Sequence, residues 1–439
     1  MTLRTKREVA LSVEKLDEIP IFPGFLVPQR YIMVLMSSCA LFVAFAARTA
    51  VQISLMEMRE EKNASSNSEE IILTSFYWGY IITHLPGGIL SEYYGAKHLL
   101  GLGVLASSII AVITPQTLHS SQLLMASRVV QGLFQGVVYP AANALLGQWI
   151  PKNERSSMAS ITFAGAQLGI ASAFLVGGNR SFYIFGGIGI IWWIAWQFLC
   201  YSSPETHPFI KDAEKEYLRE ELVGVSFKKK KIPWDKMFSS SLVWAAVGAE
   251  IGHNWCWFVL VTELPRYLES VLKFNVRQNE LVSSMPFLCM WLMSIITGFL
   301  GDVLISRKHL TVTRTRKIFT TIGYAGSSAL LLAAVGHSRT KFLALFVVGL
   351  GLMSAYNSGT KPIILDFAPN LAGVVMGIVN GFGHLVSIMM PIITLFLNPD
   401  QVLFQWKNAF CVSFLVSAFA NAVFVVFASA EEEPWNSAE

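Results

Sequence analysis

Long apolar segments recur along the whole chain, and they constrain the fold more than any other feature. A helix needs about 20 apolar residues to cross a bilayer. Of the 439 residues, 53% are hydrophobic and only 14% are charged, whereas soluble domains carry about 25% charged residues. The sequence therefore predicts an all-α membrane protein with twelve transmembrane helices, over residues 31–56, 72–91, 98–115, 121–148, 157–177, 182–201, 241–264, 282–300, 316–336, 341–359, 371–397 and 406–429.

Basic residues sort across these spans. If the N-terminus lies inside, the inner segments hold 22 Lys and Arg residues and the outer segments hold nine. The positive-inside rule then predicts that both termini are cytoplasmic. Residues 1–29 contain no apolar run that could act as a signal peptide, so we expect the first span to direct membrane insertion itself. The net charge of +4 comes with no basic groove or stacking platform, which gives no sign of a nucleic-acid partner.

The longest polar connection divides the spans six and six. We expect an N-terminal tail over 1–30, a six-helix half over 31–201, a cytoplasmic linker over 202–240, a second six-helix half over 241–429 and a C-terminal tail over 430–439. Within the linker, residues 209–222 predict an amphipathic helix, and four lysines follow, Lys228 to Lys231. Such a cluster can contact anionic lipid, or it can simply belong to the inside-positive charge.

An internal repeat supports two pseudo-symmetric halves. Gly88-Ile-Leu-Ser-Glu92 closes the second span, and Gly298-Phe-Leu-Gly-Asp302 closes the eighth span, 210 residues later. Repeats of this kind are typical of secondary transporters. An acid at a helix end beside basic residues can latch neighbouring helices in one conformation. The predicted gating residues are Gly88, Glu92, Gly95, Lys97, Gly298 and Asp302.

Several motifs carry a resemblance to a known family. Gly88-x-Leu-Ser-Glu-x-Tyr-Gly-x-Lys resembles the loop signature of the major facilitator superfamily, although Tyr93 stands where that signature has arginine. Arg128-Val-Val-Gln-Gly132 is similar to its fourth-helix signature. Further stretches are similar to the anion transporter family of sialin, the vesicular glutamate transporters and the type I phosphate cotransporters: Trp149-Ile-Pro-Lys-Asn-Glu-Arg155, Leu365-Asp-Phe-Ala-Pro369 and Met376-Gly-Ile-Val-Asn380. Glu250-Ile-Gly-His253-Asn-Trp255 looks most like the insect phosphate cotransporters.

Two arginines, Arg48 and Arg128, lie inside apolar spans. A charge near the bilayer centre costs at least about 2.5–3.5 kcal/mol, so it is rarely retained without a use. Guanidinium groups hold carboxylate or phosphate in two-point geometry, and the resemblance implies that both arginines bind the transported anion. The alternatives are that Arg48 reaches the membrane interface and that Arg128 holds helix ends together.

Three polar residues are candidates for ion coupling. Gln135 lies two turns after Arg128, on the same helix face. The resemblance places a proton-coupling glutamate there in sialin and the vesicular glutamate transporters. Because glutamine does not titrate, this difference argues against sialin-type proton symport. Glu250 and His253 lie one turn apart and could bind sodium or protons. Alternatively, they form a polar pair packed against the eleventh span, where His384 lies.

Other polar residues complete the candidate list. Asn63-Ala-Ser is a glycosylation sequon on the predicted outer side. None of the five cysteines forms a Cys-x-x-Cys pair, so we predict no metal site. Sodium, as a co-transported ion, is the only cofactor we consider. The remaining candidates line the cavity or pack between helices: Tyr80, Tyr139, Asn143, Tyr356 and Asn380.

The expected function is secondary active transport of inorganic phosphate or a small organic anion by alternating access, coupled to sodium or driven by the membrane potential. We expect a monomer that contacts membrane lipid, in the plasma membrane or in a vesicular or lysosomal membrane. The alternatives are a proton-coupled transporter of a sialic acid-like or glutamate-like anion, a passive anion channel, and a transport-inactive scaffold. No His-Glu-x-x-His, serine elbow or facing pair of catalytic aspartates indicates an enzyme.

Overall fold

The computed structural model describes residues 27–62, 66–222, 224–225, 231–259, 280–334, 339–397 and 403–436, and the regular structure within these ranges is helical. In the first part of the chain the helices are α2 (Gln29–Lys62), α3 (Ser66–Tyr94), α4 (Ala96–Thr117), α5 (Ser121–Gln135), α6 (Val138–Trp149), α7 (Arg155–Val176), α8 (Arg180–Leu199), α9 (Asp212–Glu221) and α10 (Trp234–Ser239). The second part holds α11 (Ser241–Phe258), α13 (Glu280–Ser306), α14 (Val312–Thr321), α15 (Ser327–Ala334), α16 (Arg339–Met353), α17 (Tyr356–Phe367), α18 (Ala372–Gly383), α19 (Leu385–Leu397) and α20 (Leu403–Phe427).

These helices form the twelve predicted passes. Among the described residues, nine helical segments are long and apolar enough to cross a membrane. The other three passes are α3, α11 and the pair α14 and α15. The all-α architecture predicted from the sequence is therefore confirmed.

Four passes are interrupted, whereas the sequence predicts each of them as one continuous helix. The fourth pass breaks between α5 and α6, the tenth between α16 and α17, and the eleventh between α18 and α19. The ninth pass contains a π-helical turn over Ile322–Gly326. At the first of these breaks, a side chain on Gly136 would collide with the backbone carbonyl of Tyr80 in α3, so the two helices can meet this closely only because residue 136 is glycine.

The outer surface of the helix bundle is apolar. Large aliphatic and aromatic side chains are exposed on α4, α8 and α20, including Leu102, Ile109, Ile113, Ile191, Ile194, Phe198, Leu415, Phe419 and Val426. An exposed apolar surface of this extent is costly in water and is expected where lipid is the solvent. The helices therefore present lipid-facing side chains around the bundle and keep their polar side chains inside it.

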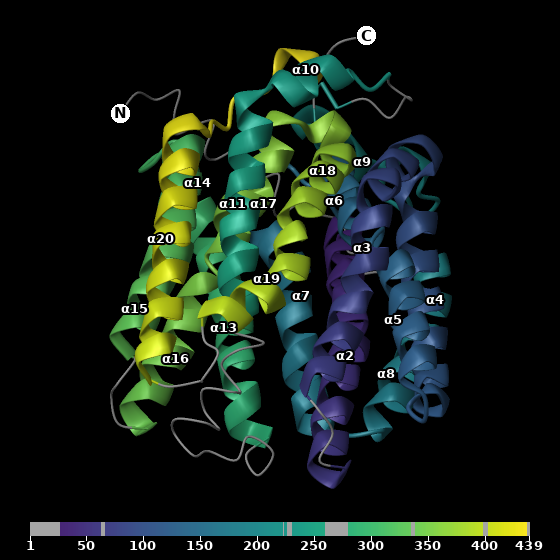
Figure 1. The fold of residues 1–439 in the computed structure, drawn as a ribbon. Coiled ribbons are helices and arrows are strands. Elements are labelled where there is room, and N and C mark those ends of the chain that lie inside the picture. Colours follow the sequence, from purple (N-terminus) through teal and green to yellow (C-terminus); the bar gives the residue numbers. More distant parts are fainter. Residues whose placement is uncertain are drawn as a thin grey trace.

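The first six passes and the last six lie side by side (Figure 1). Contacts between the two groups run mainly from α7 to α13 and from α3 and α6 to α18. Small residues line the first of these contacts, since a side chain on Gly298 of α13 would meet Ser160 of α7. Such residues allow two membrane helices to approach closely.

The linker and the C-terminal segment gather at one end of the bundle, which is drawn at the top of Figure 1 with α10 and which we call the linker end. The backbone N–H of Gln29 donates to Glu214 of α9 at 2.9 Å. Asn370 donates to the carbonyl of Gly224 at 3.1 Å, and Ser240 donates to Glu433 at 2.7 Å. The start of α2, the linker and residues 433–436 therefore cover the same face.

Candidate functional site

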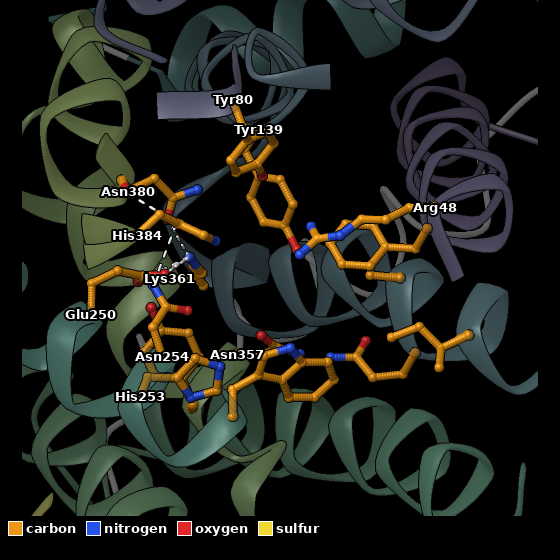
Figure 2. Close-up of a pocket in the computed structure, with 16 residues that line it drawn as sticks. Arg48, Tyr80, Tyr139, Glu250, His253, Asn254, Asn357, Lys361, Asn380 and His384 are labelled. Atoms are coloured by element: carbon orange, nitrogen blue, oxygen red, sulfur yellow. Dashed lines mark hydrogen bonds and ion pairs between the residues drawn. The ribbon is translucent and has the colours of Figure 1, made fainter. Parts of the chain in front are cut away.

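A cavity lies between the two groups of six passes, and most of the predicted site residues line it (Figure 2). Its wall is largely aromatic and polar. The lining residues are Phe45, Arg48, Tyr80, Tyr139, Ala166, Gln167, Ile170, Glu250, His253, Asn254, Trp257, Tyr356, Asn357, Lys361, Asn380 and His384. They come from α2, α3, α6, α7, α11, α17 and α18, with His384 at the break between α18 and α19. Seven residues proposed from the sequence thus meet at one place: Arg48, Tyr80, Tyr139, Glu250, His253, Tyr356 and Asn380.

Lys361 is the residue that sequence reasoning missed. The predicted tenth span, 341–359, ends before Lys361 and so places it among the inner-loop basic residues, which is wrong. The structure continues the pass through α17, so Lys361 is only 3% exposed. Its Nζ donates to both carboxylate oxygens of Glu250, at 3.1 and 3.0 Å, and to Oδ1 of Asn380 at 3.1 Å. A lysine five residues before the Asp-Phe-Ala-Pro stretch was the only available signal.

Glu250 and His253 do not pair with each other. The carboxylate of Glu250 is bound by Lys361, whereas the His253 ring stacks on the Tyr356 ring with 3.9 Å between centroids. Within the part of the chain that the structure describes, Nδ1 of His253, the hydroxyl of Tyr356 and Nδ2 of Asn380 are buried without a hydrogen-bond partner. Leaving a buried polar group unpaired costs about 1–3 kcal/mol. Three such atoms around one cavity indicate a site for a polar ligand.

Arg48 brings an uncompensated positive charge to the cavity. Its guanidinium donates a hydrogen bond to the Tyr77 hydroxyl and lies 4.4 Å from the centre of the Phe76 ring. No carboxylate of the described residues forms an ion pair with it. Because Glu250 neutralises Lys361, the cavity carries one net positive charge, from Arg48. That charge and the available guanidinium donors favour the binding of an anion in the cavity.

Arg128 lies behind this wall and does not line the cavity. It is 3% exposed, donates to Oε1 of Gln131 at 2.7 Å and lies 4.8 Å from the centre of the same Phe76 ring. Gln135, on the same helix, donates to the carbonyl of Ala44 at 3.0 Å and joins α5 to α2. Asn143 is similar, since it donates to the carbonyl of Ala372 at 3.1 Å. The structure therefore separates these three residues from those that face the cavity.

Two predicted gating acids occupy equivalent places at the linker end. Asp302 of α13 accepts hydrogen bonds from the backbone N–H groups of Ser156 and Ser157, at 2.9 and 2.8 Å, in the first turn of α7. Glu92 of α3 accepts from the N–H of Gly373, at 2.9 Å, in the first turn of α18. Each acid thus satisfies free donors at the positive end of a helix from the other half.

Three other predicted gating residues lie at the same end: Gly88, Gly95 and Lys97. A side chain on Gly88 would collide with the carbonyl of Gly373, so α3 and α18 touch through their backbones. Gly95 has φ +92° between α3 and α4, a conformation that favours glycine. Lys97 donates to the carbonyl of Gln197 at 2.8 Å, which ties α4 to α8 within the first half.

A buried ion cluster reinforces the same end. Asp366 of α17 accepts from Arg155 of α7 at 3.1 Å and from Arg316 of α14 at 2.8 Å. Arg316 also donates to the hydroxyl of Ser156 at 2.6 Å. Because α7 belongs to the first half and the other two helices to the second, the cluster joins the two halves.

Asn63 of the predicted sequon lies outside the described residues, as do Lys228 to Lys230.

Comparison with known proteins agrees with this geometry. Residues 37–391 match the Major Facilitator Superfamily model. Sheep sialin is 36% identical over 375 residues, covering 83% of this chain and 76% of sialin. A "putative inorganic phosphate cotransporter" of Drosophila ananassae is 37% identical over 385 residues, covering 83% and 80%. Bovine vesicular glutamate transporter 1 is 31% identical over 448 residues, covering 94% and 80%. The chain therefore belongs to the major facilitator superfamily and, within it, to the anion transporter family of sialin, the vesicular glutamate transporters and the phosphate cotransporters.

Proposed function

We propose that this protein is a secondary transporter that moves inorganic phosphate or a small organic anion across a membrane by alternating access. The observation that carries the proposal is the net positive charge that Arg48 brings to a cavity between the two halves. A guanidinium without a carboxylate partner, inside a cavity with unpaired polar atoms, fits a carboxylate or a phosphate ligand. The names of the relatives point to the same class of substrate.

The contacts at the linker end support a carrier rather than an open channel. Three sets of interactions join the halves on one side of the cavity, through Glu92, Asp302 and Asp366. In an alternating-access cycle these contacts break when the cavity opens to that side. The excess of basic residues in the linker and adjacent segments favours a cytoplasmic location for the linker end. We therefore propose cytoplasmic termini, and a drive from sodium or from the membrane potential.

Uptake into proteoliposomes tests the proposal. Purified protein would be reconstituted and offered labelled phosphate, glutamate or a sugar acid, under a sodium gradient, a proton gradient or an imposed potential alone. We expect saturable uptake of at least one anion. Uptake that rises with a proton gradient alone would favour the sialin-like alternative, and absence of anion uptake under every gradient, with folded protein, would contradict the proposal.

Replacing Arg48 by alanine tests the residue that carries the argument. Hydrogen bonds to charged groups contribute about 1.5–3 kcal/mol, so we expect Arg48→Ala to lower anion uptake by about tenfold or more. The matched control is Arg219→Ala, because Arg219 is an exposed arginine of α9 whose ion pairs among the described residues are with the linker carboxylates Glu205 and Glu216. Normal uptake by Arg48→Ala protein that has reached the membrane would remove Arg48 from the site.

A further inference from the structure

The ammonium group of Lys361 is enclosed by oxygen atoms from two other helices. Both carboxylate oxygens of Glu250, on α11, lie at 3.1 and 3.0 Å, and Oδ1 of Asn380, on α18, lies at 3.1 Å (Figure 2). An ammonium group has three N–H donors and no acceptor. Three oxygens therefore use all three donors, and none is left for a transported anion.

Aromatic rings complete the enclosure. The Nζ atom lies 5.1 Å from the centre of the Tyr356 ring, 5.2 Å from that of Tyr139 and 5.7 Å from that of Phe163. Ring faces attract cations within about 6 Å. Lys361 thus differs from Arg48, which faces the cavity with no carboxylate partner among the described residues.

The same oxygens would make a cation site if the lysine were absent. The carboxylate of Glu250 and the amide oxygen of Asn380 would then face each other in a buried, negatively charged place. The helix that carries Asn380, α18, ends at the interruption of the eleventh pass. Transporters of several folds bind coupling ions near the membrane centre at interrupted helices. A buried carboxylate without a partner is strongly unfavourable, so something positive must occupy this place.

We propose that Lys361 is a tethered cation that fills a monovalent-cation site formed by Glu250 and Asn380. The protein then needs no sodium ion at this site, and the anion moves past a pair that is already neutral. This inference deepens the transporter function proposed above by selecting its potential-driven form. Removal of the lysine converts the oxygens into a site for free sodium.

The test measures sodium binding directly and does not depend on transport. The apparent melting temperature of the purified full-length protein, and its binding of radioactive sodium, would be followed at pH 8 as sodium replaces choline at constant ionic strength. We expect no sodium effect on the native protein. For Lys361→Ala we expect saturable sodium binding and a rise of a few degrees, because a ligand that binds only the folded state stabilises it.

Two further variants separate a specific site from a general salt effect. Lys361→Ala combined with Glu250→Gln lacks the carboxylate, and Lys361→Arg keeps a tethered positive charge. We expect neither to respond to sodium. Failure of anion uptake by the native protein would overturn the proposed function but would leave this result standing, because neither readout involves transport.

Several outcomes would overturn the inference. One is sodium binding by the native protein that disappears in Glu250→Gln. Another is a folded Lys361→Ala protein that gains stability from protons but not from sodium. If Lys361→Ala unfolds equally in sodium and choline while the double variant folds, the oxygens do not hold a free cation. Should neither variant fold, the sodium titration of the native protein decides the question. Absence of a sodium effect supports the inference, and stabilisation by sodium overturns it.

Discussion

Two cations share the cavity, and their surroundings give them different chemistry. The charge of Lys361 is paired with a carboxylate. Among the described residues, Arg48 instead contacts aromatic rings and a tyrosine hydroxyl. Cation–π contacts contribute about 0.5–2 kcal/mol and leave the charge in place. At the scale of single residues, Lys361 therefore has a structural role in its ion pair, whereas the charge of Arg48 is available to a ligand.

Gly88 lies where α3 and α18 meet at the linker end. Its Cα faces the carbonyl of Gly373, with no room for a methyl group. We expect Gly88→Ala to shift the protein away from the closed linker end. A reporter cysteine at the buried Ser358, in a background without the native cysteines, should then react faster with a thiol reagent.

Gly187→Ala is the control for Gly88→Ala, because a side chain at position 187 meets nothing within 4 Å. It should label at the rate of the parent protein. Equal labelling of Gly88→Ala and Gly187→Ala would show that the backbone contact between α3 and α18 does not limit closure.

Arg48 and Arg128 both stood out as charges among apolar neighbours, and the structure places only Arg48 at the cavity, whereas the position of Lys361 was missed. Arg48 lies well inside its apolar segment, so it could be recognised as unusual. Lys361 follows Asn357, Ser358 and Thr360, and this polar run ended the predicted span before the lysine. The polar run is buried in the structure, since Ser358 and Thr360 bond to side chains of other helices. Hydropathy alone cannot reveal such partners.

At the scale of elements, the two halves hold each other by helix ends. Asp302 binds the start of α7 and Glu92 binds the start of α18. The gating residues could be predicted from the repeated Gly-x-Leu-small-acid pattern. The partner helices could not, because nothing in the pattern says which N-terminus the acid reaches. The interrupted passes also escaped prediction, since each break between helices is only one or two residues long and contains no proline.

Removing the charge of Asp302 should weaken one of these contacts. A negative charge near a helix N-terminus contributes about 0.3–2 kcal/mol, so we expect Asp302→Asn to change the ratio of open to closed linker end by about 2- to 30-fold. A reporter cysteine at Ser160, which is buried between α7 and its neighbours, should gain reactivity accordingly. The control is Asp212→Asn, an exposed acid in the first turn of α9. Unchanged reactivity would mean that the ion cluster at Asp366 holds the end closed without help from Asp302.

At the scale of the whole molecule, alternating access requires the halves to separate at the linker end. Ser160 of α7 and Ser358 of α17 mark that contact, because their hydroxyl oxygens lie 3.0 Å apart. The two side chains therefore point at each other across the contact, as the side chains of a disulfide must. A bond here would hold the halves together.

We expect a Ser160→Cys, Ser358→Cys protein, with Cys39, Cys200, Cys256, Cys289 and Cys411 replaced, to lose anion uptake on oxidation and to regain it on reduction. The cause would be purely mechanical, since neither serine lines the cavity. Each single-cysteine variant serves as a control and should keep its uptake under oxidant. Substrate binding, measured by equilibrium dialysis, should survive in the oxidised protein if the cavity stays accessible from the other side. Full uptake in a protein whose disulfide has been verified by mass spectrometry would show that these halves need not part here during transport.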